Sequence, residues 1–76
     1  MNKARLKELL LVGEELGDFE SRLDEILDEE RSARDSIPEN LENSTTAENM
    51  DYWIDTLEQL QSDLSDVVAE IQNAAQ

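Results

Sequence analysis

Hydrophobic residues recur at helical spacing in the first half of the chain. They alternate in steps of three and four residues, and the same steps continue through Glu30, Ala33 and Ile37. This is the heptad spacing of an apolar stripe along one face of a helix. The pattern predicts a helix over about 3–35, with a core or dimer contact row formed by Leu9, Val12, Leu16, Phe19, Leu23 and Ile26.

A second helical pattern occupies the C-terminal half, over about 46–74. Its main apolar row also steps by four and three, and a flanking row runs beside it. The apolar face is therefore about three positions per heptad wide, which suits a bundle of three or more helices. The main row is Met50, Ile54, Leu57, Gln61, Leu64, Val68, Ile71 and Ala75, and the flanking row is Trp53, Leu60, Val67 and Ala74.

The segment 36–46 separates the two patterns and is predicted to be a loop. Pro38 cannot stand inside a helix, and it disfavours helical dihedral angles at Ile37. Thr45 followed by Glu48 is a capping-box pattern, so we expect Thr45 to begin the second helix as its cap. We also expect Ile37 and Leu41 to fold back and close the core at this end.

These patterns predict an all-α fold, a two-helix antiparallel hairpin that forms a single domain over residues 1–76. A lone hairpin has one helix–helix seam and leaves the sides of both apolar stripes in water. The simplest cover is a second copy of the chain, so we expect a homodimer that forms a four-helix bundle. The alternative cover is a target protein.

Gly13 and Gly17 stand one turn apart inside the first predicted helix. Each glycine costs about 1 kcal/mol relative to alanine in a helix interior. Close approach of another helix, or a kink, would explain both residues, and contact with a target is the alternative.

The charge of the chain says more about its partners than any motif does. Asp and Glu number 20 against 6 Lys and Arg, a net charge of −14, and no basic residue follows Arg34. Such acidity repels nucleic acid and anionic lipid, so we expect neither as a direct partner. A basic protein surface is the natural partner. The longest apolar run, Leu9 to Val12, is far too short to cross a membrane, and we expect a cytoplasmic protein.

Carboxylates crowd the outer faces of both predicted helices. Neighbours three and four residues apart lie about 5–6 Å from each other, a spacing comparable to that of phosphates along a nucleic-acid strand. Solvated helix faces ordinarily interleave Lys with Glu, whereas the second helix has no Lys. The predicted partner-binding residues are Asp51, Asp55, Glu58, Asp63, Asp66 and Glu70, supported by Asp24, Glu25, Asp28 and Glu29.

Two aromatic residues stand together at the start of the second helix. Trp53 belongs to the flanking row and is predicted to pack in the core or in a dimer. Tyr52 faces outward and is a candidate binding hot spot. Arg31 and Arg34 lie near this end of the hairpin, where they are expected to stack on the two rings.

Catalytic chemistry has little support in the sequence. The chain has no His and no Cys, which removes the commonest general base and two metal ligands. Glu25-x-x-Asp28 and Asp63-x-x-Asp66 have the one-turn spacing of magnesium-binding carboxylate pairs. Both pairs lie on polar faces, and the second helix offers no cation to hold phosphates. We therefore expect no enzyme activity, metal or cofactor, and a magnesium-dependent nucleotide pyrophosphohydrolase is the least favoured alternative.

The stretch LDEILDEERSARDSIPENLENSTTAENMDYWIDTLEQL resembles small acidic proteins of unassigned function encoded by bacteria and their phages and prophages. The matching positions are Asp28-Glu29-Glu30, Pro38-Glu39-Asn40-Leu41 and Asn43-Ser44. The resemblance implies a helical hairpin of mobile-element origin in a bacterial host cell, and it transfers no active residue.

The leading hypothesis is a non-enzymatic, phage-type inhibitor, such as an anti-CRISPR or anti-restriction protein. Acting as a DNA mimic, it would occlude a basic nucleic-acid-binding surface of a host protein. The alternative is a structural or assembly adaptor, a coiled coil whose acidity serves only solubility.

Overall fold

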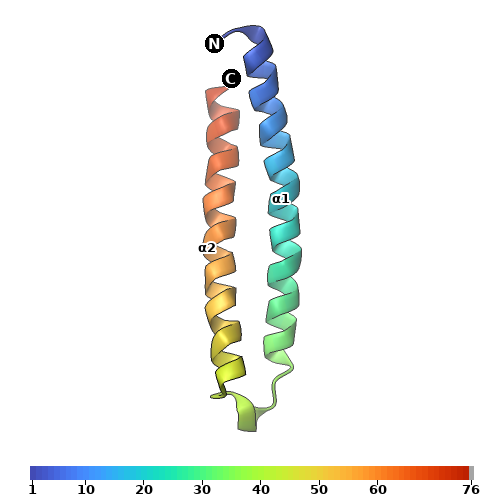
Figure 1. Cartoon of the computed structure of the whole chain (residues 1–76), viewed down its shortest axis with the longest axis vertical. Helices are drawn as coiled ribbons and strands as arrows, with labels where there is room; N and C mark the ends of the chain where they lie inside the picture. The colour runs from blue at the N-terminus through green and yellow to red at the C-terminus, as the bar shows by residue number, and fades with distance from the viewer. Residues whose placement is uncertain (76) are drawn as a thin grey trace.

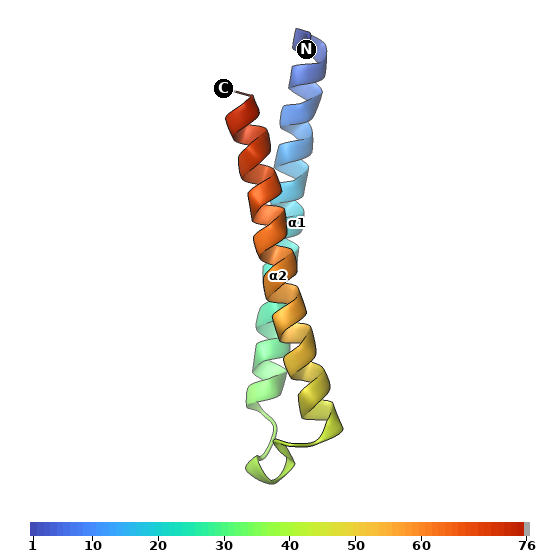
Figure 2. The same ribbon diagram turned by 90° about the vertical axis from the view of Figure 1, so that its left-hand side faces the viewer.

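Two long helices fold back on each other in a computed structural model that describes residues 1–75 (Figure 1). Helix α1 spans Lys3–Asp35 and helix α2 spans Thr45–Ala74, with a short 3-10 helix, η1, at Glu39–Leu41 between them. The two long helices run antiparallel and cross at a small angle (Figure 2). Both termini lie at one end of the rod, the open end, and the connection lies at the other, the loop end. The predicted all-α hairpin is confirmed.

Local side-chain bonds set the ends of α1. Its first turn is capped by Asn2, whose Oδ1 accepts a hydrogen bond from the backbone N–H of Arg5 at 2.9 Å. At the other end the Ser36 hydroxyl donates to the carbonyl of Ser32 at 2.9 Å. Pro38 follows two residues later, where its ring prevents the helix from continuing.

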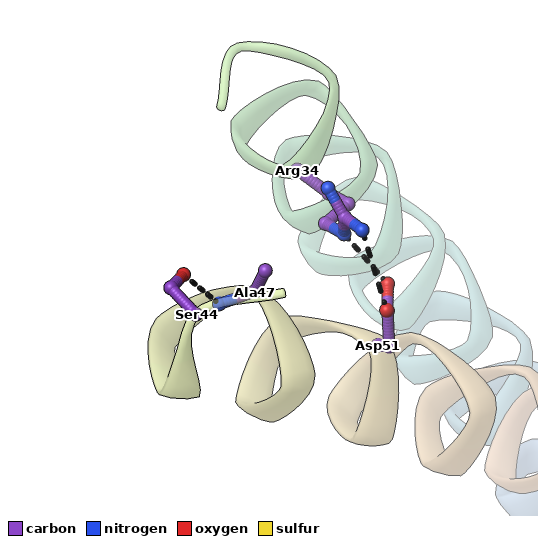
Figure 3. Close-up of polar contacts among 4 residues, drawn as sticks. All are labelled: Arg34, Ser44, Ala47 and Asp51. Carbon is purple, nitrogen blue, oxygen red and sulfur yellow. Dashed lines mark hydrogen bonds and ion pairs between the residues drawn. The ribbon is translucent and has the colours of Figure 1, made fainter. Parts of the chain in front are cut away.

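Helix α2 begins one residue earlier than its capping pattern suggested. The Ser44 hydroxyl accepts a hydrogen bond from the backbone N–H of Ala47 at 3.2 Å, so Ser44 is the cap (Figure 3). The prediction that Thr45 caps the helix is wrong. Thr45 is the first helical residue, and Ala47 in the first turn is fully buried.

The loop end is closed differently from the prediction. Leu41 is 48% exposed, so its expected contribution to the core is wrong. Turn hydrogen bonds hold the loop instead, from Leu41 N–H to the Pro38 carbonyl at 2.9 Å and from Ser44 N–H to the Leu41 carbonyl at 3.0 Å. Ile37 is partly buried and Ala47 is fully buried, and these residues cover the end of the seam.

The seam between the helices is offset on α1 from the expected contact row. Val12, Phe19 and Ile26 are about half exposed and lie beside the seam. Leu9, Leu16 and Leu23 belong to both the predicted row and the seam, and they are partly buried. Between them, the seam uses the residue that follows each expected one, so that Gly13, Glu20 and Leu27 replace Val12, Phe19 and Ile26. The seam row of α1 is Leu6, Leu9, Gly13, Leu16, Glu20, Leu23, Leu27, Glu30 and Arg34, all of them buried or partly buried.

On α2 the seam follows the main apolar row, and the flanking row lies outside it. Trp53, Leu60 and Val67 of the flanking row are about half exposed. The seam row of α2 is Ala47, Met50, Ile54, Leu57, Gln61, Leu64, Val68 and Ile71, again buried or partly buried. The fully buried core is thin. Among residues 1–75, the apolar side chains less than a tenth exposed are Leu27 at 2%, Ala47 at 0% and Leu57 at 8%.

The two glycines of α1 have different surroundings. A Cβ atom on Gly13 would lie 3.1 Å from Cγ2 of Ile71, so the missing side chain lets α2 approach closely there. A Cβ atom on Gly17 would meet nothing within 4 Å. The prediction of close helix packing therefore holds for Gly13 and is wrong for Gly17.

None of the helices in the described part of the chain is both long and apolar enough to span a membrane.

Candidate protein-binding surface

All ten carboxylates predicted to bind a partner are exposed. They do not share one face, because a helix turns through 3.6 residues and their spacing carries them around the rod. Glu25 and Asp66 lie on the faces of their helices that point away from the seam. Glu29, Asp63 and Glu70 lie on one side of the rod. The others lie on the opposite side, which we call the acidic side: Asp24, Asp28, Asp51, Asp55 and Glu58.

Two arginines of α1 pair with carboxylates of this acidic side. Arg31 donates to Oε1 of Glu58 at 2.8 Å and lies 3.7 Å from Oδ1 of Asp28. Arg34 donates to Asp51 from Nε at 2.8 Å (Figure 3). Both pairs that cross between the helices lie in the half of the rod nearer the loop.

These ion pairs offset part of the negative charge of the acidic side. The hydrogen bond to Glu58 raises the pKa of Arg31, and the hydrogen bond to Asp51 raises the pKa of Arg34. Three predicted contact residues, Asp28, Asp51 and Glu58, are therefore partly neutralised by the chain itself. The two arginines were expected to stack on aromatic rings, and they bind carboxylates instead.

A shallow hollow of about 300 Å³ opens near the middle of the rod. Its carboxylates come from both helices, and its remaining lining is hydroxyl and amide groups. Such a group of acceptors suits the ammonium of a lysine or the guanidinium of an arginine. The lining residues are Glu20, Glu58, Gln61, Ser62, Ser65 and Asp66.

Sequence reasoning missed four of these lining residues: Glu20, Gln61, Ser62 and Ser65. The signal that marks the hollow is a polar residue at a seam position on each helix, Glu20 on α1 and Gln61 on α2. Glu20 was overlooked because the predicted stripe of α1 passed through Phe19.

Tyr52 points to solvent and is 60% exposed. Its ring meets that of Trp53 edge to face, with 5.3 Å between the ring centroids. Within residues 1–75, the cation over an aromatic ring is Arg22, which lies 5.7 Å from the centroid of Phe19. Tyr52 therefore stays a candidate hot spot, held by its aromatic neighbour rather than by Arg31 or Arg34.

The two carboxylate pairs considered for magnesium are exposed. In the part of the chain that the structure describes, no three His, Cys, Asp or Glu side chains gather closely enough to hold a metal ion together. Asp63 accepts a hydrogen bond from the Gln59 amide at 2.8 Å.

No known protein family, curated protein or solved structure matches this chain.

Proposed function

We propose that this chain is a non-enzymatic protein-binding inhibitor, encoded by a phage or another mobile element, that covers a basic nucleic-acid-binding surface of a bacterial host protein. One observation carries the proposal. Helix α2 exposes every one of its carboxylates, from Glu48 to Glu70, and contains no Lys or Arg. A face selected only for solubility gains from interleaved Lys and Glu, and α2 forgoes those pairs.

The shape of the molecule supports the same proposal. The hairpin is a rod with Cα dimensions of 60 × 15 × 14 Å, and its backbone is held by hydrogen bonds within two continuous helices. Carboxylates at one-turn spacing on a stiff rod imitate the charge of a nucleic-acid strand for a groove lined by Lys and Arg. The hollow beside Glu20 and Asp66 offers one such cation a set of acceptors.

Binding of this kind depends on ionic strength. Interactions between exposed charges are screened over about 8–10 Å at physiological salt, so affinity for a basic target should fall steeply as NaCl is added. Double-stranded DNA should compete, because it would occupy the same basic surface of the target.

The experiment is a capture from a bacterial lysate on the immobilised full chain. The column is eluted in parallel with a NaCl gradient and with excess duplex DNA, and the released proteins are identified by mass spectrometry. The proposal expects a nucleic-acid-binding protein that both eluents release. A captured protein that neither eluent releases would contradict it.

A matched pair of variants tests the assigned surface once the target is purified. Asp55→Asn with Asp66→Asn removes two charges from the proposed surface, and Glu8→Gln with Glu15→Gln removes two from the flank opposite the acidic side. The first pair should weaken binding by about tenfold, equivalent to about 1.4 kcal/mol, and the second by about twofold or less. Equal losses would show that net charge alone matters.

An assembly adaptor is the second candidate function. Exposed apolar residues that gather on one side of a protein mark an interface. The half-exposed residues beside the seam favour an adaptor for this reason, and they are Val12, Phe19 and Ile26 of α1 with Trp53, Leu60 and Val67 of α2. For an adaptor, reversing the charges of Asp55, Glu58 and Asp66 together should leave binding intact. Leu60→Asp, at a half-exposed position beside the seam, should abolish it.

A further inference from the structure

Six of the large apolar residues that the hairpin leaves about half exposed precede a seam residue by one position. They are 44–50% exposed, and they stand directly before Gly13, Glu20, Leu27, Ile54, Gln61 and Val68 in the sequence. We call these six residues the apolar side: Val12, Phe19 and Ile26 of α1 with Trp53, Leu60 and Val67 of α2.

Antiparallel geometry places both rows of the apolar side on the same flank of the rod. In an antiparallel pair, the residues that stand one position before the seam residues lie on the same flank of the rod in both helices. The ion pair between Arg31 and Glu58 gives an independent check. Each of these residues follows a seam residue by four positions, and they meet across the seam at 2.8 Å, so those two rows share the opposite flank.

The apolar side is continuous along the rod. The close approach of Ile71 to Gly13 sets the register of the two helices, which brings Phe19 to about the level of Val67 and Ile26 to about that of Leu60. The first and last members of each row are 14 residues apart in the sequence, or about 21 Å along the helix. Single exposed apolar residues are normal on a protein surface, but a double row of this length marks an interface.

We propose that a second copy of this chain covers the apolar side, head to tail, and so forms a four-helix bundle. A helix with a seam row and one further apolar row has the pattern of a bundle helix, which contacts one neighbour through the seam and a second through the additional row. Both helices of the hairpin have this pattern. A two-fold axis across the rod matches the apolar side to itself in length and in width.

Charge at the two ends favours the head-to-tail orientation, although this orientation brings the two copies of Arg22 together near the axis. Arg5 continues the row of Val12 and Phe19 by one heptad at the open end, and it forms no salt bridge within residues 1–75. Glu39 and Glu42 lie at the loop end, and neither forms a salt bridge within residues 1–75. The head-to-tail arrangement brings each Arg5 over the loop-end carboxylates of the other copy. A parallel arrangement would bring like charges together at both ends.

The dimer leaves the acidic side free, because the acidic side and the apolar side lie on opposite flanks of the seam. The predicted contact residues Glu29, Asp63 and Glu70 instead border the apolar side. Self-association and binding of a basic target then respond oppositely to salt. Each copy carries a net charge of −14, so NaCl should strengthen the dimer by screening repulsion between copies, while it weakens binding to a basic target.

Sedimentation equilibrium of the full chain tests the proposal, with Leu60→Glu and Leu11→Glu as a matched pair. Leu60 and Leu11 are 46% and 50% exposed, and Leu11 lies on the face of α1 away from the seam. The wild type should have twice the chain mass of 8.7 kDa, with a dissociation constant that falls as NaCl rises. Leu60→Glu should be monomeric with an unchanged helical circular dichroism spectrum, and Leu11→Glu should remain dimeric.

A wild type that stays monomeric at high concentration in high salt would overturn the proposal and leave the apolar side to a different partner. Dissociation by Leu11→Glu, or retention of the dimer by Leu60→Glu, would also overturn it.

Disulfide formation tests the orientation, because the chain has no cysteine of its own. The axis of a head-to-tail dimer passes between the levels of Phe19 and Ile26, close to Arg22. A single Arg22→Cys substitution should therefore form disulfide-linked dimers under mild oxidation. Glu8→Cys, two heptads earlier on the same row, should not. Efficient cross-linking of Glu8→Cys would overturn the head-to-tail arrangement.

Discussion

Leu27 and Leu57 are the large residues that anchor this hairpin. They are 2% and 8% exposed, while most other seam residues are only partly buried. The seam also contains Gly13, Glu20 and Gln61, which contribute little apolar area. Hydrophobic stabilisation in proportion to buried area is therefore concentrated at the few positions where both helices place leucine.

We predict that Leu27→Ala costs about 2–4 kcal/mol of the free energy of unfolding, because it removes buried methyl groups and leaves a cavity. Leu11→Ala removes the same atoms from a half-exposed position, so its cost should stay within about 1 kcal/mol. Urea unfolding followed by circular dichroism, at one protein concentration for all variants, gives both values. Equal losses for the two variants would show that Leu27 is not part of a real core.

Each long helix is specified by local signals at its ends and by a repeating apolar pattern between them. Pro38 ends the helical segment of α1, and Ser44 begins that of α2. Between the ends, the two glycines of α1 report how closely α2 approaches. Gly13 sits against Ile71, whereas Gly17 faces open space.

The two glycines of α1 are predicted to respond differently to substitution by alanine. Gly17→Ala should raise the free energy of unfolding by about 0.5–1 kcal/mol, because alanine favours the helix and its Cβ atom meets no neighbour. Gly13→Ala should gain less, because its Cβ atom would press on Ile71 at 3.1 Å. Thermal and urea unfolding of both variants measure the difference. A larger gain at Gly13 would contradict the close packing of Ile71 against Gly13.

At the scale of the whole molecule, net charge opposes the compact fold. All carboxylates other than Glu20 and Glu30 are exposed, and the salt bridges in residues 1–75 involve two of the arginines. Repulsion among the remaining charges raises the free energy of the hairpin, and it also opposes association of two copies.

We therefore predict that NaCl stabilises the chain. Raising the concentration from about 0.02 M to about 0.5 M shortens the screening length from about 20 Å to about 4 Å, and the melting temperature should rise by several degrees. Thermal unfolding followed by circular dichroism measures the effect. Sulfate has additional effects through its exclusion from protein surfaces, so chloride is the better probe. A melting temperature that falls with NaCl would show that ion pairs, rather than repulsion, dominate the electrostatics of the fold.

The hairpin follows from local signals in the sequence. Heptad spacing, the proline at position 38 and the change from helix formers to turn residues act over a few neighbouring residues, so they can be read without knowledge of the partner helix. The excess of carboxylates on α2 was likewise visible in the sequence. The position of the cap was off by one residue, because Ser44 and Thr45 both have a hydroxyl that can cap a helix.

Contacts between the two helices determine which side of the α1 stripe meets α2. Leu9, Leu16 and Leu23 belong equally to a row completed by Val12 and Phe19 and to one completed by Gly13 and Glu20, and both rows keep the heptad spacing. Hydrophobicity favours the first row. The hairpin uses the second, because Gly13 admits Ile71 and because this rotation of α1 joins Arg31 to Glu58 and Arg34 to Asp51. Pairing between distant residues thus fixed the seam, the hollow beside Glu20 and the apolar side left exposed.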